Sequence, residues 1–218
     1  MTKTLRILIT AGPTIEPIDP VRFISNRSTG LMGYELARLA KKRRYKVILI
    51  SGPTNIRPPK GVEFLPIETA GQMYKEVRQN IGKADILVMA SAVSDFRPLS
   101  FSKNKIKKTR KDFTLKLIRN RDILKSVSNI GRKNKILVGF SLETKDVLKN
   151  AADKLRDKNL DLIVANKVSR YIIPFGKGDK TVYLLDNHGR QNKLYKWPKT
   201  RIASAILDTI EDLCYTPN

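Results

Sequence analysis

Six short apolar runs alternate with segments of helical period, and this alternation limits the possible folds more than any other feature of the chain. The apolar runs lie at 6–11, 47–50, 62–65, 85–90, 135–140 and 160–165. Helices are expected between them at about 32–43, 70–81, 121–130, 146–158 and 199–213. Near-continuous aliphatic and β-branched strands separated by helices are typical of a parallel sheet buried on both faces. The pattern predicts a Rossmann-like three-layer α/β sandwich.

The last part of the chain follows a different pattern. Two apolar runs, 181–185 and 193–195, flank the turn-forming sequence Asp-Asn-His-Gly at 186–189. A short connection of this composition indicates a β-hairpin, so an antiparallel hairpin is expected after the mostly parallel sheet. With neither an internal repeat nor a linker, residues 1–218 are expected to form a single domain.

The charge of the chain points to anionic partners. Lys and Arg number 43 against 20 Asp and Glu, which gives a formal net charge of +23. Such an excess suits nucleic acid, acidic membranes or phosphorylated small molecules. One cysteine, Cys214, cannot form an internal disulfide, and no apolar run reaches membrane-spanning length. We therefore expect a soluble cytoplasmic protein that does not bind a membrane.

Several familiar site types are excluded. The first apolar run is followed by Ala-Gly-Pro-Thr at 11–14, so the glycine spacing of a dinucleotide fingerprint is absent, and the chain has no P-loop sequence. A single histidine, His188, and a single cysteine make a His-centred triad or a zinc site implausible. Any chemistry must use Asn, Asp, Lys and backbone amides.

A Ser/Thr/Gly-rich turn precedes the first expected helix. Ser28, Thr29 and Gly30 stand where free backbone N–H groups and the positive end of the helix dipole suit a phosphate. The same residue types also serve as a plain helix cap, so both interpretations stay open. Asn26, close by, offers a neutral amide that can orient or polarise a carbonyl group without titrating.

Asp95 follows another expected strand, within the small-residue segment 90–98. Ligands of open α/β sheets bind at the carboxyl ends of strands, so Asp95 is a candidate to bind a ribose hydroxyl or Mg²⁺. The alternative is that Asp95 caps a helix or turn.

Two further polar segments follow. The segment 103–111 holds six cations in nine residues; it is either a solvated loop, a nucleic-acid patch or a flap that closes over a polyphosphate. The lack of interleaved aromatic residues weakens the nucleic-acid interpretation. At 119–124 a second helix start, with Asn120 or Asp122 near the cap, offers a second anion site.

Seven segments together resemble the phosphopantothenoylcysteine synthetases, the phosphopantothenate–cysteine ligases of coenzyme A biosynthesis. They are I-S-N-R-S-T-G-L-M-G at 24–33, A-S-A-V-S-D-F at 90–96, K-I-K-K at 105–108, N-R-D-I-L at 120–124, G-F-S-L-E-T at 139–144, K-N-L-D-L-I-V-A-N at 158–166 and F-G at 175–176. The resemblance runs from Arg6 to about Leu213. It implies a stand-alone ligase without flavin, whose product passes to a separate flavin-dependent decarboxylase.

The resemblance implies a reaction in two steps. The carboxylate of 4′-phosphopantothenate attacks the α-phosphate of a nucleoside triphosphate, and the amine of L-cysteine then attacks the acyl-nucleotide. Bacterial members generally use CTP, so CTP and Mg²⁺ are expected, and the family implies a homodimer. Positioning and charge stabilisation carry both steps without a protein nucleophile.

The resemblance also implies roles for single residues. Asn26 orients the acyl-nucleotide, Lys105 is the essential first lysine of the K-x-K-K motif, and Phe140 contacts the base. Lys154 and Lys158 lie four residues apart on one expected helix face. The residues that the resemblance places in contact with the nucleotide are Asp95, Lys105, Arg121, Asp122, Ile123, Leu124, Phe140, Lys154 and Lys158. The residues that it places in contact with the substrate are Asn26, Ser28, Thr29 and Gly30.

Two other classes remain as alternatives. A nucleic-acid-binding α/β protein is favoured by the net charge alone, and a nicotinamide-dependent oxidoreductase is favoured by the fold class alone. The chain also departs from many family members at Gly178-Asp179-Lys180, where they carry an acidic residue and then Asn. The ligase is the function that we expect, without nucleic acid as a partner.

Overall fold

The computed structural model describes residues 4–108, 112–130, 132, 135–168, 175 and 178–215. Residues 109–111 of the expected flap and residue 176 of the F-G motif lie outside the described residues.

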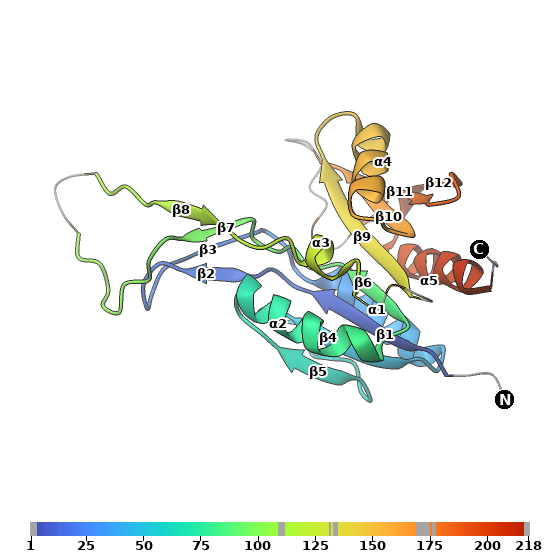
Figure 1. The fold of residues 1–218 in the computed structure, drawn as a ribbon, viewed down its shortest axis with the longest axis horizontal. Helices are drawn as coiled ribbons and strands as arrows, with labels where there is room; N and C mark the ends of the chain where they lie inside the picture. Colours follow the sequence, from blue (N-terminus) through green and yellow to red (C-terminus); the bar gives the residue numbers. More distant parts are fainter. Residues whose placement is uncertain are drawn as a thin grey trace.

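An eight-stranded sheet in the order β12-β11-β10-β9-β6-β1-β4-β5 forms the centre of the molecule (Figure 1). Its parallel part consists of β1 (Arg6–Ala11), β4 (Lys46–Ser51), β5 (Glu63–Pro66), β6 (Ile86–Met89), β9 (Ile136–Glu143) and β10 (Leu162–Lys167). The hairpin of β11 (Lys180–Asp186) and β12 (Gln191–Trp197) extends the sheet antiparallel to β10. The predicted α/β sandwich with a C-terminal hairpin is confirmed.

The strand order changes direction next to β1. From β1 the chain adds β4 and β5 on one side, and it then returns to add β6, β9 and β10 on the other. The loops that leave β1 and β6 stay hydrogen-bonded to each other through Gly12, Thr14 and Ala92. In open α/β sheets such a switch point opens a crevice at the carboxyl ends of the strands, where ligands bind.

Helices cover both faces of the sheet. In the described part of the chain, α1 (Leu31–Lys42) and α5 (Lys199–Tyr215) pack on one face. The other face carries α2 (Ala70–Asn80), a 3₁₀ turn (Ile81–Lys83), α3 (Ile123–Val127) and α4 (Val147–Asp157). The two layers explain why the strands are apolar without a break, since both faces are buried.

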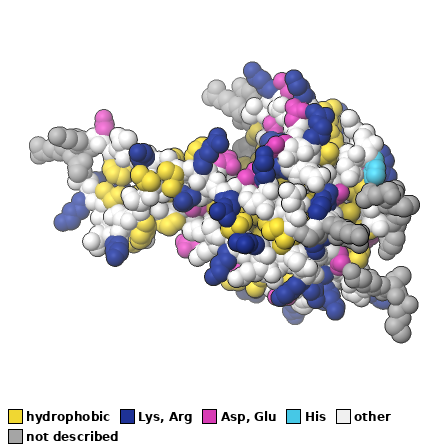
Figure 2. Space-filling view, viewed as in Figure 1, with side chains coloured by type: hydrophobic (Ala, Val, Ile, Leu, Met, Phe, Trp, Pro, Cys, Tyr) yellow, Lys and Arg dark blue, Asp and Glu magenta, His cyan; other side chains and the backbone are white. Residues whose placement is uncertain are grey.

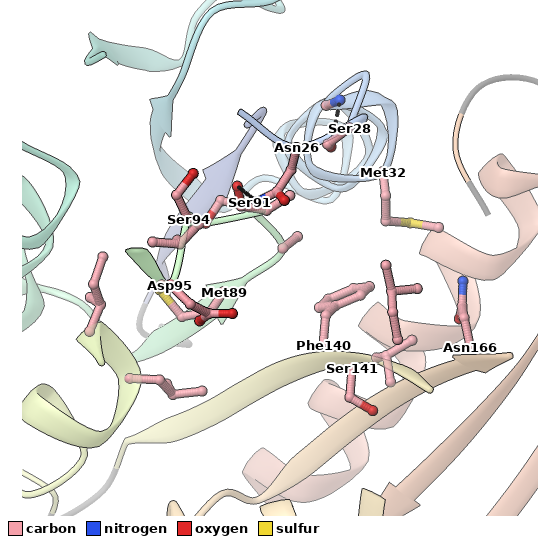
Figure 3. Close-up of a pocket in the computed structure, with 18 of the residues that line it drawn as sticks. Asn26, Ser28, Met32, Met89, Ser91, Ser94, Asp95, Phe140, Ser141 and Asn166 are labelled. Carbon is pink, nitrogen blue, oxygen red and sulfur yellow. Dashed lines mark hydrogen bonds between the residues drawn. The ribbon is translucent and has the colours of Figure 1, made fainter. Parts of the chain in front are cut away.

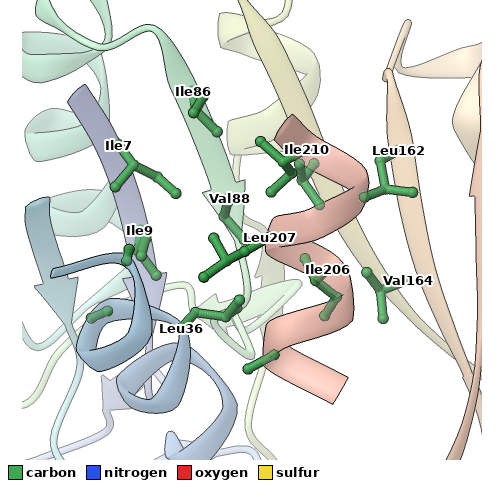
Figure 4. Packing of buried hydrophobic residues seen from close by; sticks show 14 of the residues in the cluster. Ile7, Ile9, Leu36, Ile86, Val88, Leu162, Val164, Ile206, Leu207 and Ile210 are labelled. Atoms are coloured by element: carbon green, nitrogen blue, oxygen red, sulfur yellow. The ribbon is translucent and has the colours of Figure 1, made fainter. Parts of the chain in front are cut away.

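Alternate residues of one strand reach opposite cores. Ile7 and Ile9 of β1 face α1 and α5, whereas Leu8 faces α2, and all three are 0% exposed. Figure 4 shows part of the first core, in which side chains of the sheet pack against α1 and α5; the labelled residues are Ile7, Ile9, Leu36, Ile86, Val88, Leu162, Val164, Ile206, Leu207 and Ile210. Burial of these side chains is the main stabilising contribution to the fold.

One predicted helix is wrong in its bounds. The segment 121–130 forms only the short helix α3, Ile123–Val127, followed by a turn. The Asp122 carboxylate caps its start, and the Ser128 hydroxyl donates to the carbonyl of Lys125 near its end. Local side-chain bonds of this kind compete with helix continuation, which the periodicity alone does not reveal.

An arm projects from one end of the sheet. It consists of two short ribbons, β2 (Ile15–Pro17) with β3 (Phe23–Ser25), and β7 (Phe96–Pro98) with β8 (Leu117–Arg119), that the sequence periodicity did not predict (Figure 1). Apolar side chains gather on its surface in Figure 2, and those that are 43–58% exposed are Val21, Phe23, Phe96, Leu99, Phe101, Phe113 and Leu117.

None of the described helices is long and apolar enough to cross a bilayer.

Candidate functional site

A cavity of about 850 Å³ opens at the carboxyl ends of the parallel strands, where the strand order reverses. Its wall is built from the turn before α1, the loop after β6, the start of α3, the end of β9, one face of α4 and the first residue of α5 (Figure 3). Segments far apart in sequence thus converge on one space.

The cavity brings together every predicted site residue except Lys105. Those that line it are Asn26, Ser28, Thr29, Gly30, Asp95, Arg121, Asp122, Ile123, Leu124, Phe140, Lys154 and Lys158. Phe140 and Asp95 lie on opposite sides of the opening in Figure 3. Residues chosen by a sequence motif therefore share one site in space.

The turn before α1 leaves helix amides without a side-chain cap. Gly30 occupies the N-cap position with φ of 76°, in the left-handed region, and no side chain of the described residues bonds to the first turn. A Cβ atom at Gly30 would lie 2.7 Å from Cγ2 of Thr54, so both the backbone angle and the space require glycine. The Ser28 hydroxyl accepts a bond from the Gly30 amide at 3.3 Å. Between the two interpretations of this turn, this geometry favours an anion site over a plain cap.

Asn26 is fixed against the loop that follows β6. Its Nδ2 donates to the carbonyl of Ala92 at 3.1 Å, while the side chain stays exposed at the cavity wall. That loop is in turn tied to the loop after β1, since the Ala92 amide donates to Gly12 at 2.9 Å and the Ser94 amide donates to Oγ1 of Thr14 at 2.9 Å. The amide of Asn26 is therefore presented by two strand-end loops that support each other.

Asp95 lies exposed at the rim of the cavity. Its backbone carbonyl accepts a bond from the Asn120 amide at 2.8 Å, and Asn120 Nδ2 donates to the carbonyl of Ser94 at 2.9 Å. These bonds join the loop after β6 to the start of α3. The residue that caps α3 is Asp122, so Asp95 does not cap this helix and its carboxylate faces solvent.

At the start of α3 the expected free amides are partly used. Oδ1 of Asp122 accepts from the Lys125 amide at 3.0 Å, and its Oδ2 pairs with Nζ of Lys158 at 2.9 Å. Burial alone would raise the pKa of Asp122, but the Lys125 amide and the Lys158 ammonium outweigh it and lower the pKa. The positive charge beside the start of α3 therefore comes from side chains more than from free backbone amides. One of these side chains is Arg121, whose guanidinium carbon lies 4.7 Å from the centre of the Tyr74 ring.

The two lysines of α4 are held by carboxylates. Lys154 pairs with Oε1 of Glu143 at 2.6 Å, and Lys158 pairs with Asp122. Burial tends to raise the pKa of Glu143, but the bond and charge of Lys154 together with the bond from Asn150 outweigh burial and lower the pKa. The ion pairs orient both ammonium groups along the cavity wall, which agrees with their expected position on one helix face.

Three polar residues of the cavity were not predicted. Lys180, Lys199 and Asn166 come from β11, the start of α5 and β10, and meet on the side of the sheet that α1 and α5 cover. The Asn166 Oδ1 is buried, and within the described residues it accepts no hydrogen bond. Burial and the charge of Lys180 lower the pKa of Lys199 to about 8. Asn166 ends the family segment at 158–166, and β-strand alternation places it on the same face as Val164, so these two signals could have pointed to this group.

Lys105 lies outside the cavity. It is exposed on the arm, in the long connection between β7 and β8, and it is not among the lining residues. Its expected contact with a phosphate therefore requires either movement of this connection or a second copy of the chain.

Comparison with known proteins identifies the family of the chain. The family model described as DNA/pantothenate metabolism flavoprotein C-terminal domain matches residues 2–213. The chain belongs to this family. The coenzyme A biosynthesis bifunctional protein CoaBC of Bacillus subtilis is 43% identical over 208 residues, which cover 95% of this chain and 51% of that protein. The chain therefore spans about half the length of this relative.

Solved structures share the fold of this family member. A crystal structure of the C-terminal domain of a CoaBC protein has a TM-score of 0.82 at 36% identity, covering 96% of this chain and 95% of that one. A mutant of Cab2 in complex with phosphopantothenate-cysteine has a TM-score of 0.76 at 20% identity, covering 96% of this chain and 87% of that one. At 20% identity, the likeness to Cab2 shows a common fold and no more.

The partly buried ammonium of Lys199 predicts a pH-dependent stability. Because its pKa lies below the usual lysine value of 10.5, the unfolded chain binds more protons between about pH 8 and 10.5, and stability rises with pH in that window. Lys199→Met should therefore stabilise the protein at pH 7 by about 1 kcal/mol, after allowance for solvent screening, and the gain should vanish as the pH rises through the window. Urea unfolding at several pH values measures this. The control Lys60→Met removes an exposed lysine and should show no such trend; a pH-independent gain at Lys199 would contradict the assignment.

Proposed function

We propose that this protein is a phosphopantothenate–cysteine ligase that joins 4′-phosphopantothenate and L-cysteine through an acyl-nucleotide. The observation that carries the proposal is one cavity that collects Asn26, the uncapped turn before α1, Asp95 and the basic side chains of Arg121, Lys154 and Lys158. Membership of the family supports the same activity.

The first step needs charge stabilisation and no protein nucleophile. A carboxylate oxygen of 4′-phosphopantothenate attacks the α-phosphorus, the bond from this phosphorus to the bridging β-oxygen breaks, and pyrophosphate leaves. Arg121, Lys158 and the amides at the start of α1 offset the negative charge that gathers on the phosphates. Ion pairing to Asp122 pre-orients Lys158, so little reorganisation is needed when a phosphate arrives.

The second step depends on the acyl carbonyl. The amine of L-cysteine attacks the acyl carbon, the bond from this carbon to the phosphate oxygen breaks, and the nucleoside monophosphate leaves with one oxygen of the original carboxylate. Asn26 carries two N–H donors and uses one on the Ala92 carbonyl, so its second donor can hold the acyl oxygen. The amide stays neutral throughout the reaction.

CTP and Mg²⁺ complete the proposal. The bacterial type of the segments at 24–33 and 105–108 supports CTP as the nucleotide. Across the described residues, no group of three His, Cys, Asp or Glu side chains forms a metal site, whereas Asp95 presents a carboxylate at the cavity rim. This donor set fits Mg²⁺, which is usually held by one or two carboxylates together with substrate phosphates. When bound, Mg²⁺ neutralises phosphate charge.

A homodimer is part of the proposal. The exposed apolar side chains on the arm form the kind of surface that marks a protein contact. The other candidate is the edge strand β12, but it carries the exposed residues Lys193, Tyr195 and Lys196. Charged edges discourage strand pairing, so the arm is the better supported contact.

The alternatives are less well supported. On the face shown in Figure 2, Lys and Arg side chains are scattered over the surface and interspersed with Asp and Glu, whereas a nucleic-acid-binding protein usually has a basic stripe. The turn that leaves β1 lacks the glycine spacing of a nicotinamide site.

An assay of nucleoside monophosphate release tests the proposed function. CMP should form from CTP only when phosphopantothenate and cysteine are both present, and turnover with CTP should exceed that with ATP at equal concentration. Release of CMP that does not depend on cysteine, or no release at all, would contradict the ligase. Faster turnover with ATP would overturn only the choice of nucleotide.

The substitution Asn26→Asp should separate the two steps. Activation of the carboxylate should survive, so pyrophosphate still forms, whereas transfer to cysteine should fall at least about 100-fold because an anion cannot donate to the acyl oxygen. Single-turnover experiments should show accumulation of the acyl-nucleotide. Asn55→Asp, on an exposed loop residue outside the cavity, is the matched control. Equal losses in both steps would show that Asn26 has no specific part in transfer.

A further inference from the structure

Asp19 is a buried carboxylate that the proposed reaction does not use. The residue is 2% exposed and lies in the turn between β2 and β3 on the arm, far from the cavity lining. A buried charge is costly unless donors surround it, so its partners indicate what it does.

Five donors converge on this carboxylate. Oδ1 accepts the amides of Val21 and Arg22, both at 2.9 Å, which closes the local turn. Oδ2 accepts two bonds from the Arg22 guanidinium, and it also accepts the amide of Ile106 at 3.1 Å. The guanidinium holds the pKa of Asp19 well below its usual range, so the carboxylate stays ionised at neutral pH.

The bond to Ile106 reaches across 87 positions of the sequence into the cationic loop. Arg22 strengthens the same junction, because its guanidinium donates to the Ile106 carbonyl at 2.8 Å. At the other end of the loop, the amide of Ser102 donates to the carbonyl of Ile18 at 3.0 Å. The stretch 102–106 is thus fastened at both ends to the turn at 18–22, and Lys105 is the residue next to one fastening point.

We propose that Asp19 is a positioning residue that, together with Arg22, clamps the loop 102–106 to the arm and so sets where Lys105 is presented to a nucleotide bound in the cavity of a second copy of the chain. This role rests on the proposed function and the proposed homodimer, and on the nucleotide contact that the family resemblance implies for Lys105. Without the clamp, the loop would remain attached only through its flanking strands β7 and β8, and Lys105 would sample many positions. A misplacement of about 1 Å can cost as much as about 100-fold in rate.

The substitution Asp19→Asn tests the clamp. It keeps the shape of the side chain but replaces one oxygen by an N–H₂ group, which would face the donors of Arg22 and Ile106. Asp186 provides a matched control, because it closes the hairpin turn between β11 and β12 in almost the same way. Its Oδ1 accepts the amides of His188 and Arg190, and its Oδ2 accepts the Arg190 side chain. Asp186→Asn therefore breaks a similar local turn away from the lysine loop.

Limited trypsin digestion examines the clamp without an activity assay. Cleavage after Lys103 and Lys105 should be faster in Asp19→Asn than in the unmodified protein, and unchanged in Asp186→Asn, because release of the loop exposes it to the protease. Circular dichroism verifies that each variant is folded. Equal cleavage rates in all three proteins would overturn the clamp.

A double-mutant cycle then tests whether the clamp acts through Lys105. Asp19→Asn should lower kcat at least about tenfold with little change in the KM for CTP, and Lys105→Ala should lower it further. The double variant should be no slower than Lys105→Ala alone, within about twofold, whereas effects that multiply would show that Asp19 acts independently of Lys105. Lys103→Ala, which removes a neighbouring charge, should combine with Asp19→Asn multiplicatively. If the unmodified protein makes no ligase product, the proposed function fails, and the digestion still decides the clamp.

Discussion

The parallel hydrogen bonding of β1 to its two neighbours is the constraint on which the rest of the structure depends. β1 pairs with β4 on one side and β6 on the other, in both cases parallel, so all three strands end at the same edge of the sheet. The turn before α1, the loop after β6 and the ends of β9 and β10 meet at this edge, and the space between them is the cavity. The functional groups converge because the strands beneath them are parallel and aligned.

The walls of this cavity are rigid because their polar groups bond to one another. Ala92 and Ser94 are tied to the loop after β1, and Asn120 ties the start of α3 to the loop after β6. Each bond joins segments that are distant in sequence, so the catalytic geometry is a property of the folded core. Two carboxylates, Glu143 and Asp122, hold lysines at the opposite wall in the same manner. Preorganised dipoles and charges are what a reaction without a protein nucleophile requires.

Much of this arrangement could be predicted from the sequence. The continuous apolar runs predicted the buried parallel strands, because successive side chains of each strand pack into opposite cores, as those of Ile7 and Leu8 do. Asn26 and Lys158 could be placed in one site because the family motifs name them. The length of α3 could not be predicted, since it is set by the side-chain bonds of Asp122 and Ser128.

The short ribbons of the arm also escaped sequence reasoning. Strands of three residues are too short to show a period, and their pairing depends on contacts between distant segments. For the same reason Lys105 was predicted to share a site with the residues of the cavity, whereas it lies on the arm. Lys199 was missed because it stands at an ordinary helix start, and although Asn166 ends a family segment, only the fold brings the two residues together.

The central claim is that the cavity joins the carboxylate of phosphopantothenate to the α-phosphorus of the nucleotide. Phosphopantothenate labelled with ¹⁸O in its carboxylate, turned over with CTP and cysteine, tests it directly by mass spectrometry of the products. The account predicts one labelled oxygen in the phosphate of CMP and none in pyrophosphate. Label in pyrophosphate or in free inorganic phosphate, or unlabelled CMP alongside full formation of the amide product, would contradict it.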